Sequence, residues 1–438
     1  MADNVLSTWQ PFLYELKGKV WQLFPTEAPL LAEFSGVGDP SSVGRFTRDM
    51  DGNRDVFSGK SVRHTVVLAQ LPGAGFIQET QTWNVPQVLQ TQQVNINLVR
   101  SMVPYSVSVD VERDSFDNSA AAAVESLTDQ ARIALARMEN LALCGDGTGL
   151  QAAITDGATS LTTTVLTGSP PGNFDVLLPG TVWDIVTRAT GADPGQGLRR
   201  KIASVNETTG VITWDTAQQA SDGGTGNIVH TAADGIYIPG SWSNGTLGQA
   251  PGALVAQGLE QAAAITGTFE GLAKGTFVPW QGTDGRGGDT SVLGLSAQIL
   301  DGAVRRGRRA GLGKWDFGIG DPAVIDLYKQ GLYAQVRYEP QYANLKSSFP
   351  GIVYDGADAP FPLIKEPAVR KGSLKLIDKA SFQMYGDQKG PDFLDDDGAI
   401  FRRFSRNLTK EANLLDRWQL GVTKCNTIVF LNNLAQAA

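Results

Sequence analysis

The stretch that decides the fold, residues 103–149, reads VPYSVSVDVERDSFDNSAAAAVESLTDQARIALARMENLALCGDGTG. Apolar and polar residues alternate from Tyr105 to Glu112, with Tyr and Val on one face and Ser, Asp and Glu on the other. Because successive side chains of a strand point to opposite faces, this pattern predicts a half-buried strand with one face in water.

Residues 119–144 are expected to form one long helix. Apolar residues recur at helical spacing from Val124 to Leu141, Asn118 or Ser119 can cap the first turn, and Gly145 is the expected stop. A helix of 26 residues is about 39 Å long at a rise of about 1.5 Å per residue. A helix of this length is expected to act as a beam, with Cys144 buried at its end.

The N-terminal residues 1–45 are expected to form an arm. An apolar stripe at helical spacing begins at Phe12 and ends before Pro25, and Trp9, Trp21 and Phe24 add apolar surface beside it. Two interpretations remain open, because such a segment needs cover. The arm packs either on the protein's own core or on a neighbouring subunit.

On either side of the central stretch the sequence predicts mainly strands. Strands are expected at Ser61–Gln70 and around Val94–Leu98. In the segment 157–240, two strands joined by the loop Asn206–Gly210 and a further strand region at Leu177–Thr187 predict a small β-barrel or sandwich, inserted into a larger domain.

The segment 241–379 is expected to be mixed α/β. A helix is expected from Leu293 to Val304, a short strand at Phe317–Ile319, and a helix capped by Asp321 that starts at Pro322 and stops at Gly331. Further strands are expected at 352–354, 361–364 and 427–431. The fold class is therefore α+β.

The amino-acid composition limits the classes of protein and of functional site that this chain can represent. The chain has 438 residues, a net charge of −8, 42% hydrophobic and 19% charged residues, typical of a globular protein of two or three domains. It has two cysteines and two histidines, and no run of apolar residues long enough to span a membrane. This excludes a disulfide framework and makes a zinc site improbable. We expect no cofactor, no metal and no catalytic residues.

Three motifs resemble ligand sites but do not meet the requirements of one. The run Gly145–Gly149 follows a helix and lacks the Lys-Ser/Thr ending of a phosphate-binding loop. Residues 49–60 have the oxygen spacing of a calcium loop, but Lys60 stands where a glutamate is required. Asp395–Asp397 is more typical of a solvated turn.

One dense basic cluster stands out in this acidic chain, and its members are Arg305, Arg306, Arg308 and Arg309. The sequence places it after a helix C-terminus, where the helix dipole favours cations. Three interpretations remain open: a solvated capping face, a contact with acidic groups of another subunit, or a contact with nucleic acid.

The order of these elements resembles the major capsid protein family of tailed double-stranded DNA phages. The passage Val103–Gly149 is similar to that family's strand leading into the spine helix, and Phe317–Pro322 with 350–367 to its axial domain. The resemblance implies a shell subunit, not an enzyme, that forms hexamers and pentamers of an icosahedral head, is assembled in the bacterial cytoplasm and ends in the virion. DNA is enclosed without sequence-specific binding, and no membrane is involved.

The resemblance also implies a division of the chain: an N-arm at 1–45, the β-hairpin E-loop with flanking strands at 46–102, the peripheral domain with its spine helix at 103–156, the inserted β-barrel at 157–240, the axial domain at 241–379, and a return to the peripheral domain at 380–438. Lys60 and Arg63 of the E-loop join the arm's aromatic residues and the basic cluster as candidate assembly contacts. A separate scaffolding protein, a portal and a decoration protein are the implied partners.

Two alternatives remain. An encapsulin-type nanocompartment shell is similar in fold, but its chains are shorter and lack the inserted domain. A β-rich hydrolase with a carboxylate pair is the alternative from another class, and it would require acidic residues that converge in a deep pocket.

Overall fold

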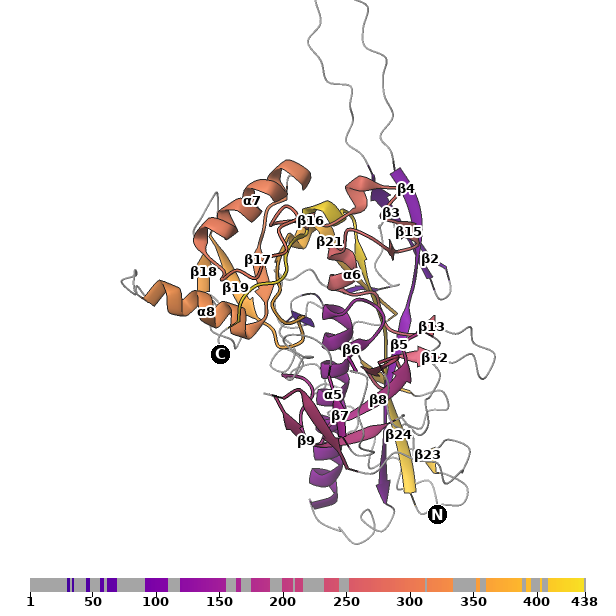
Figure 1. Cartoon of the computed structure of the whole chain (residues 1–438). Helices are drawn as coiled ribbons and strands as arrows, with labels where there is room; N and C mark the ends of the chain where they lie inside the picture. Colours follow the sequence, from indigo (N-terminus) through magenta and orange to yellow (C-terminus); the bar gives the residue numbers. More distant parts are fainter. Residues whose placement is uncertain are drawn as a thin grey trace, which may run out of the picture.

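A computed structural model describes the chain from residue 30 onward with gaps. The described residues are 30, 31, 34, 45–47, 56–58, 61–68, 91–108, 119–154, 163–166, 175–189, 199–207, 209–215, 232–243, 252–311, 313–333, 352–354, 360–387, 391–394, 402–403 and 409–436. The element order is strand-rich, with helices few in number, so the architecture is mixed α and β (Figure 1).

A long antiparallel ribbon supports one side of the molecule (Figure 1). β5 (Val99–Ser108) pairs with β24 (Thr409–Val422) from Val99↔Trp418 to Ser108↔Thr409. Shorter strands complete this sheet around β24, and they are β1 (Arg45–Thr47), β21 (Phe382–Gly386), β22 (Asp392–Phe393) and β23 (Arg402–Arg403). β5 begins six residues before the predicted alternation, and the predicted residues 109–112 lie outside the described part.

The predicted long helix is confirmed: α5 runs from Ser119 to Cys144 and lies along β5 (Figure 1). Polar side chains help to fix the helix to the strand. The Ser101 hydroxyl donates to Glu139 Oε1 at 2.5 Å, and the hydroxyls of Tyr105 and Thr128 lie 3.1 Å apart. Within the described residues, no helix has the length and apolar character needed to cross a membrane.

A second six-stranded sheet forms the other main body. Its strands in order are β16 (Thr283–Asp284), β25 (Val429–Leu431), β20 (Leu374–Ile377), β17 (Phe317–Gly320), β19 (Phe361–Lys365) and β18 (Ile352–Tyr354). α7 (Ala297–Gly311) and α8 (Pro322–Tyr333) bury apolar residues against the same face of this sheet. The other face packs against the main core of the molecule.

The strands predicted at Phe317–Ile319, 352–354 and 361–364 and the Asp321 cap are confirmed, since Asp321 Oδ1 accepts from the Ala323 N–H at 3.1 Å. Three details were wrong. α7 starts at Ala297, because Leu293 instead forms a bridge with Leu434. α8 continues through Gly331 to Tyr333. The last strand starts at Val429 and joins the second sheet, because Thr427 belongs to the short helix η4 (Cys425–Thr427).

A third six-stranded sheet is formed by strands that follow α5 in the sequence and precede those of the second body. Its strands in order are β6 (Leu150–Ala153), β11 (Asp234–Tyr237), β8 (Val182–Thr187), β9 (Arg200–Asn206), β10 (Val211–Trp214) and β7 (Thr163–Val165). A bridge between Ile154 and Leu166 joins the two outer strands, so the strands follow one another in a ring. The ring starts at β6, before residue 157, because β6 pairs with β11.

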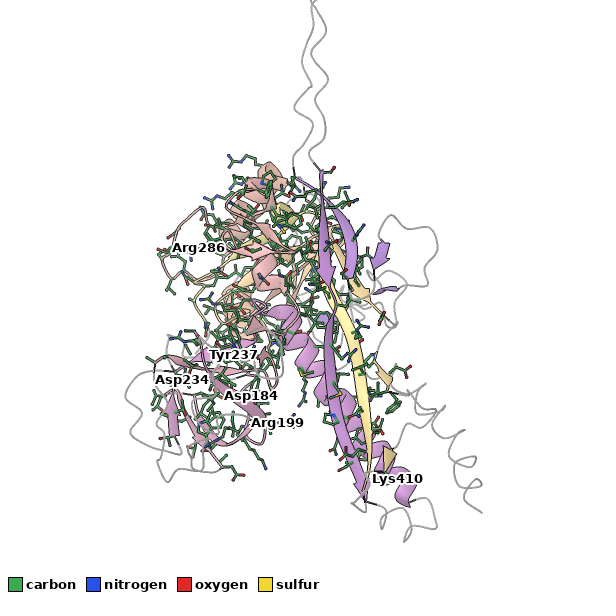
Figure 2. The ribbon with its side chains drawn as sticks, turned by 90° about the vertical axis from the view of Figure 1, so that its right-hand side faces the viewer. Asp184, Arg199, Asp234, Tyr237, Arg286 and Lys410 are labelled. Carbon is green, nitrogen blue, oxygen red and sulfur yellow. The ribbon has the colours of Figure 1, made fainter. Side chains whose placement is uncertain are left out.

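The hairpin between β9 and β10 was predicted with its turn, and Gly210 has the expected left-handed backbone with φ +71°. Asp184 of β8 fixes two other left-handed positions of this ring. Its carboxylate oxygens accept from the N–H groups of Arg199 and Gly240, each at 2.6 Å. Figure 2 shows Asp184, Arg199 and Asp234 in a lobe beside the long helix and ribbon.

Smaller elements surround these bodies. A three-stranded sheet contains β2 (Val56–Ser58), β3 (Ser61–Val67) and β4 (Thr91–Asn97). Strands were predicted at β3 and β4, and β2 was not identified. The other short elements are the hairpins β12 (Trp242–Ser243) with β13 (Gly252–Ala253) and β14 (Thr268–Phe269) with β15 (Leu272–Ala273), the helix α6 (Leu259–Ala263), and the turns η2 (Val278–Trp280) and η3 (Lys379–Ser381). β4 continues into β5 after Leu98.

Candidate assembly surfaces

The predicted contact residues fall into two groups. Trp9, Phe12, Trp21, Phe24 and Lys60 lie outside the described residues and stay predictions. Arg63 and the four arginines of the basic cluster are described, and they belong to two separate surfaces, one on β3 and one on α7.

Arg63 lies on the outer face of the β2–β3–β4 sheet. It is exposed opposite Asn95 of β4, whereas its neighbours Val62 and His64 are buried. The inner face is fixed to the core partly by His64, whose Nδ1 lies 2.7 Å from the Tyr385 hydroxyl of β21. The outer face of β3 and β4 is therefore a polar surface with one positive charge, supported by an apolar inner face.

The basic cluster lies on α7 itself. The sequence placed it after a helix C-terminus, and this was wrong, because the helix continues to Gly311 and includes all four arginines. Arg305, Arg306 and Arg309 are exposed and Arg308 is half-buried. The helix is close-packed below them, since a Cβ added to Gly307 would lie 2.4 Å from atoms of Trp315 and Val429. The cluster is a positively charged face on a firmly packed helix.

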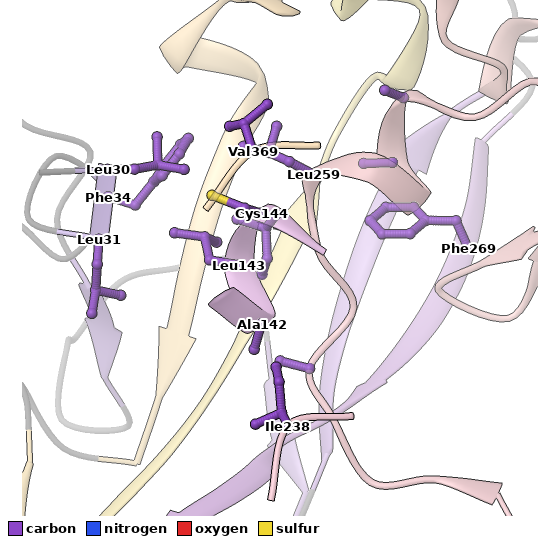
Figure 3. Packing of buried hydrophobic residues seen from close by; sticks show 14 of the residues in the cluster. Leu30, Leu31, Phe34, Ala142, Leu143, Cys144, Ile238, Leu259, Phe269 and Val369 are labelled. Carbon is purple, nitrogen blue, oxygen red and sulfur yellow. The ribbon is translucent and has the colours of Figure 1, made fainter. Parts of the chain in front are cut away.

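Three described residues of the expected N-terminal arm are anchored in the main core. Leu30, Leu31 and Phe34 are fully buried. Figure 3 shows Leu30 and Phe34 packed near Cys144 at the end of α5. The Phe34 ring centroid lies 5.3 Å from that of Phe382 and 6.4 Å from that of Phe317. These three residues of the expected arm 1–45 thus pack on the protein's own core, where the two main bodies meet.

Buried polar groups join the two main bodies at the same place. Glu366, 2% exposed, accepts from the Asn140 side chain of α5 at 2.9 Å and from the Ala368 N–H at 3.2 Å. Burial raises the pKa of Glu366, although hydrogen bonds from Ala368, Asn140 and the Leu30 N–H oppose the shift. One carboxyl group therefore contacts the helix, the second body and the anchored N-terminal residues.

An ion pair lies close by. Lys375 of β20 is 1% exposed, and its Nζ lies 2.5 Å from Glu260 Oε2 of α6. Burial opposes ionisation of Glu260, but the charges of Lys375 and Arg370 outweigh it, so its pKa is lowered. Burial, together with Glu366 and Glu260, raises the pKa of the Cys144 thiol against the effect of Lys375. We call Asn140, Cys144, Glu260, Glu366 and Lys375 the joint cluster.

A second buried acid lies in the β14–β15 hairpin. Glu270, 3% exposed, has a left-handed backbone with φ +49° and accepts from the Val422 N–H of β24 at 2.7 Å. Burial raises the pKa of Glu270 well above its usual value, against the Val422 hydrogen bond and the charge of Lys274. Lys274 donates to the carbonyls of Ala262 and Ala264 at 2.6 and 2.8 Å, and burial lowers its pKa.

Glu270 should make stability depend on pH. Because its pKa is higher in the folded than in the unfolded protein, its contribution is complete below the usual value of 4.5 and is lost as the pH rises through the raised pKa. Glu366 acts in the same direction. Glu270→Gln keeps the oxygen that accepts from Val422 but removes the charge. We therefore expect a flatter decline of the free energy of unfolding as the pH rises above 4.5, measured by urea unfolding.

The matched control is Glu207→Gln, at an exposed position after β9. It should leave the pH dependence as in the wild type. A Glu270→Gln variant with the wild-type slope would show that Glu270 is not the group that titrates.

Sequence reasoning did not identify the joint cluster or the Glu270 site. The chain has 45 acidic residues, and nothing in their spacing distinguishes these three glutamates. Within the described residues no group of three or more His, Cys, Asp or Glu side chains is placed to hold a metal ion. The buried glutamates instead accept structural hydrogen bonds or pair with lysine.

Comparison with known proteins identifies the fold. No family model matches the chain, and no curated protein matches it. Among solved structures, a chain of the cyanophage A-1(L) capsid asymmetric unit matches over 94% of both chains, with a TM-score of 0.51 and 11% identity. The chain therefore has a phage capsid protein fold.

Looser matches include Gordonia phage Cozz, with a TM-score of 0.39, 12% identity and coverage of 86% of this chain and 81% of the other. The SrpI encapsulin of Synechococcus elongatus has a TM-score of 0.38, 8% identity and coverage of 85% and 84%.

Proposed function

We propose that this chain is a major capsid protein whose copies assemble into the hexamers and pentamers of an icosahedral phage head that encloses double-stranded DNA. The observation that carries the proposal is the agreement of fold with the cyanophage A-1(L) capsid chain over 94% of both chains. The agreement therefore extends over nearly the whole chain and is not limited to one module. The protein acts as a structural subunit.

The described elements support an assignment of the domains of a capsid subunit. α5 and the ribbon of β5 and β24 serve as the spine of a peripheral domain. The second six-stranded sheet, with α7 and α8, serves as the axial domain. β3 and β4 are the base of the E-loop within 46–102, and residues 1–45 are the N-arm. A subunit with extended limbs can bury surface against its neighbours, and many modest contacts add up across a closed shell.

The ring of six strands is the proposed inserted β-barrel. It is supported by the bridge between Ile154 and Leu166, which connects the outer strands. Lys371 connects this insertion to the axial domain, since its ammonium contacts Asp175 and lies 3.6 Å from Asp321. We propose that the insertion braces the subunit and offers a surface for a decoration protein.

The remaining partners follow from the proposed shell. A separate scaffolding protein and a portal would take part in assembly, which takes place in the bacterial cytoplasm and ends in the virion. The DNA is enclosed without sequence-specific contacts, consistent with a net charge of −8.

The test is assembly of the purified chain, alone and co-expressed with the candidate scaffolding protein of the same genome. Sedimentation velocity and negative-stain imaging should find capsomers of five- or six-fold symmetry or closed shells. Particle diameter separates a phage head from a small nanocompartment of the encapsulin type. A monomer or dimer under both conditions would contradict the proposal, and a search for a carboxylate-lined pocket would follow.

A further inference from the structure

On the exposed face of α7, three arginines carry positive charge that the described part of the subunit does not neutralise. In the described part of the chain, no carboxylate lies within ion-pair distance of Arg305, Arg306 or Arg309. Their hydrogen bonds go to backbone carbonyls instead: Arg305 donates to Asp301 at 3.3 Å, and Arg306 to Gly285 at 2.6 Å. With respect to the described residues, most guanidinium donors of these three arginines are therefore free for a partner.

The helix holds these arginines in fixed positions. Leu300, Ala303 and Val304 are fully buried on its inner side, so α7 cannot rotate or shift without opening the core. Arg305 and Arg309 are four residues apart, so they lie on the same face at a separation of roughly 6 Å along the helix axis. A guanidinium group presents a planar fork of donors that fits a carboxylate with two hydrogen bonds.

We infer that this arginine face binds carboxylates of a second copy of the chain, as one of the contacts that hold a capsomer together. The inference rests on the proposed function. Outside the cluster the chain has 33 Lys and Arg residues against 45 Asp and Glu residues, so two copies repel each other over most of their surfaces. A concentrated positive face is where two such copies approach with favourable electrostatics.

The surroundings favour a protein partner over a nucleic acid. A phosphate backbone is bound by an extended basic surface, whereas this cluster covers little more than one helical turn. Exposed charges of both signs flank it in the sequence, with Asp301 one turn before Arg305 and with Lys314 and Asp316 beyond the end of the helix. Mixed charge of this kind suits a contact between two protein surfaces better than a contact with a polyanion.

The test compares two variants with the same change in net charge. Arg305→Glu/Arg309→Glu reverses the proposed contact, and Arg188→Glu/Lys201→Glu reverses two exposed charges on the six-stranded ring. Light scattering and sedimentation velocity measure the protein concentration at half-maximal assembly. We expect the α7 variant to need about tenfold more protein or worse, and the ring variant to assemble like the wild type.

A milder variant separates binding from folding. Arg305→Gln/Arg309→Gln keeps good helix formers, so its circular dichroism should match the wild type while its assembly depends less on salt. Normal assembly of the α7 variants, or equal loss in both charge-reversed variants, would overturn the inference but leave the proposed function intact. The inference would also be overturned, with the proposed function intact, if the α7 variants assemble normally and lose only the binding of duplex DNA. Failure of the wild type to assemble would instead remove the proposed function, and this inference with it.

Discussion

Replacing Gly258 with alanine is expected to destabilise the folded subunit by about 3 kcal/mol or more. Gly258 precedes α6 and crosses the C-terminal end of α5. A Cβ at this position would lie 2.4 Å from the carbonyl oxygens of Ala142 and Gly145 and 2.8 Å from that of Leu143. These are backbone atoms at the end of a packed helix, so they cannot move aside as the tip of a flexible side chain would.

The glycine is needed for this close approach and not for an unusual backbone angle, because its φ is −109°. The close approach also gives hydrogen-bond partners to backbone groups at two helix ends. The Glu260 N–H, at the start of α6, donates to the carbonyl of Gly145, just after α5, at 3.1 Å. Alanine would both overlap the α5 carbonyls and weaken this connection between α5 and α6.

The control is Gly302→Ala in α7, where an added Cβ meets nothing within 4 Å. Alanine there should stabilise the helix by about 0.5–1 kcal/mol. Urea unfolding of the unassembled protein measures both variants. An unfolding midpoint for Gly258→Ala equal to that of the wild type would mean that the chain does not pass this close to the end of α5.

Local patterns made part of the fold predictable. The helix from Ser119 to Cys144 was predicted with its bounds, because its apolar spacing and flanking residues lie within one continuous segment. The strand–Asp321–helix unit and the β9–β10 hairpin were predictable for the same reason. In each case the deciding interactions connect residues that are close in sequence.

Pairings between distant segments were not predictable in this way. β25 joins β20 across more than fifty residues, and no local signal reveals that the last strand returns to the second sheet. Gly331 has open space around it and continues in the helix, although its residue type predicted a stop. The candidate assembly surfaces also combine local and non-local information. The run of arginines was visible in the sequence, but its position on α7 became known only from the residue at which the helix ends.

The joint cluster is the clearest case of a site that the sequence hides. Lys375 and Glu260 are 115 positions apart, and each is an ordinary charged residue until the fold buries Lys375 and leaves Glu260 only 19% exposed. They meet where α5, α6, β20 and the buried Leu30 come together. The cluster therefore fixes the relative position of the two main bodies, on which the shape of the subunit depends.

Lys375→Met is expected to cost about 3–5 kcal/mol of folding free energy at neutral pH, because it leaves the charge of Glu260 buried without its closest partner. Arg370 offers little compensation, since it is 71% exposed and its Nη1 lies 3.8 Å from Glu260 Oε1. Without Lys375, burial would raise the pKa of Glu260. The cost should therefore shrink as the pH falls toward 4, where Glu260 takes up a proton.

The double variant Glu260→Gln/Lys375→Met should recover most of the loss, because removing both charges leaves no uncompensated ion in the core. Lys365→Met is the matched control. Its partner Asp326 is 42% exposed, so this pair is worth about 0–1 kcal/mol and its loss should hardly change with pH. Urea unfolding of the wild type, Glu260→Gln, Lys375→Met and the double variant at pH 4 and 7 completes the cycle, and Lys365→Met is measured beside them. If the double variant is as unstable as Lys375→Met alone, the lysine stabilises the joint cluster through its packing and not through Glu260.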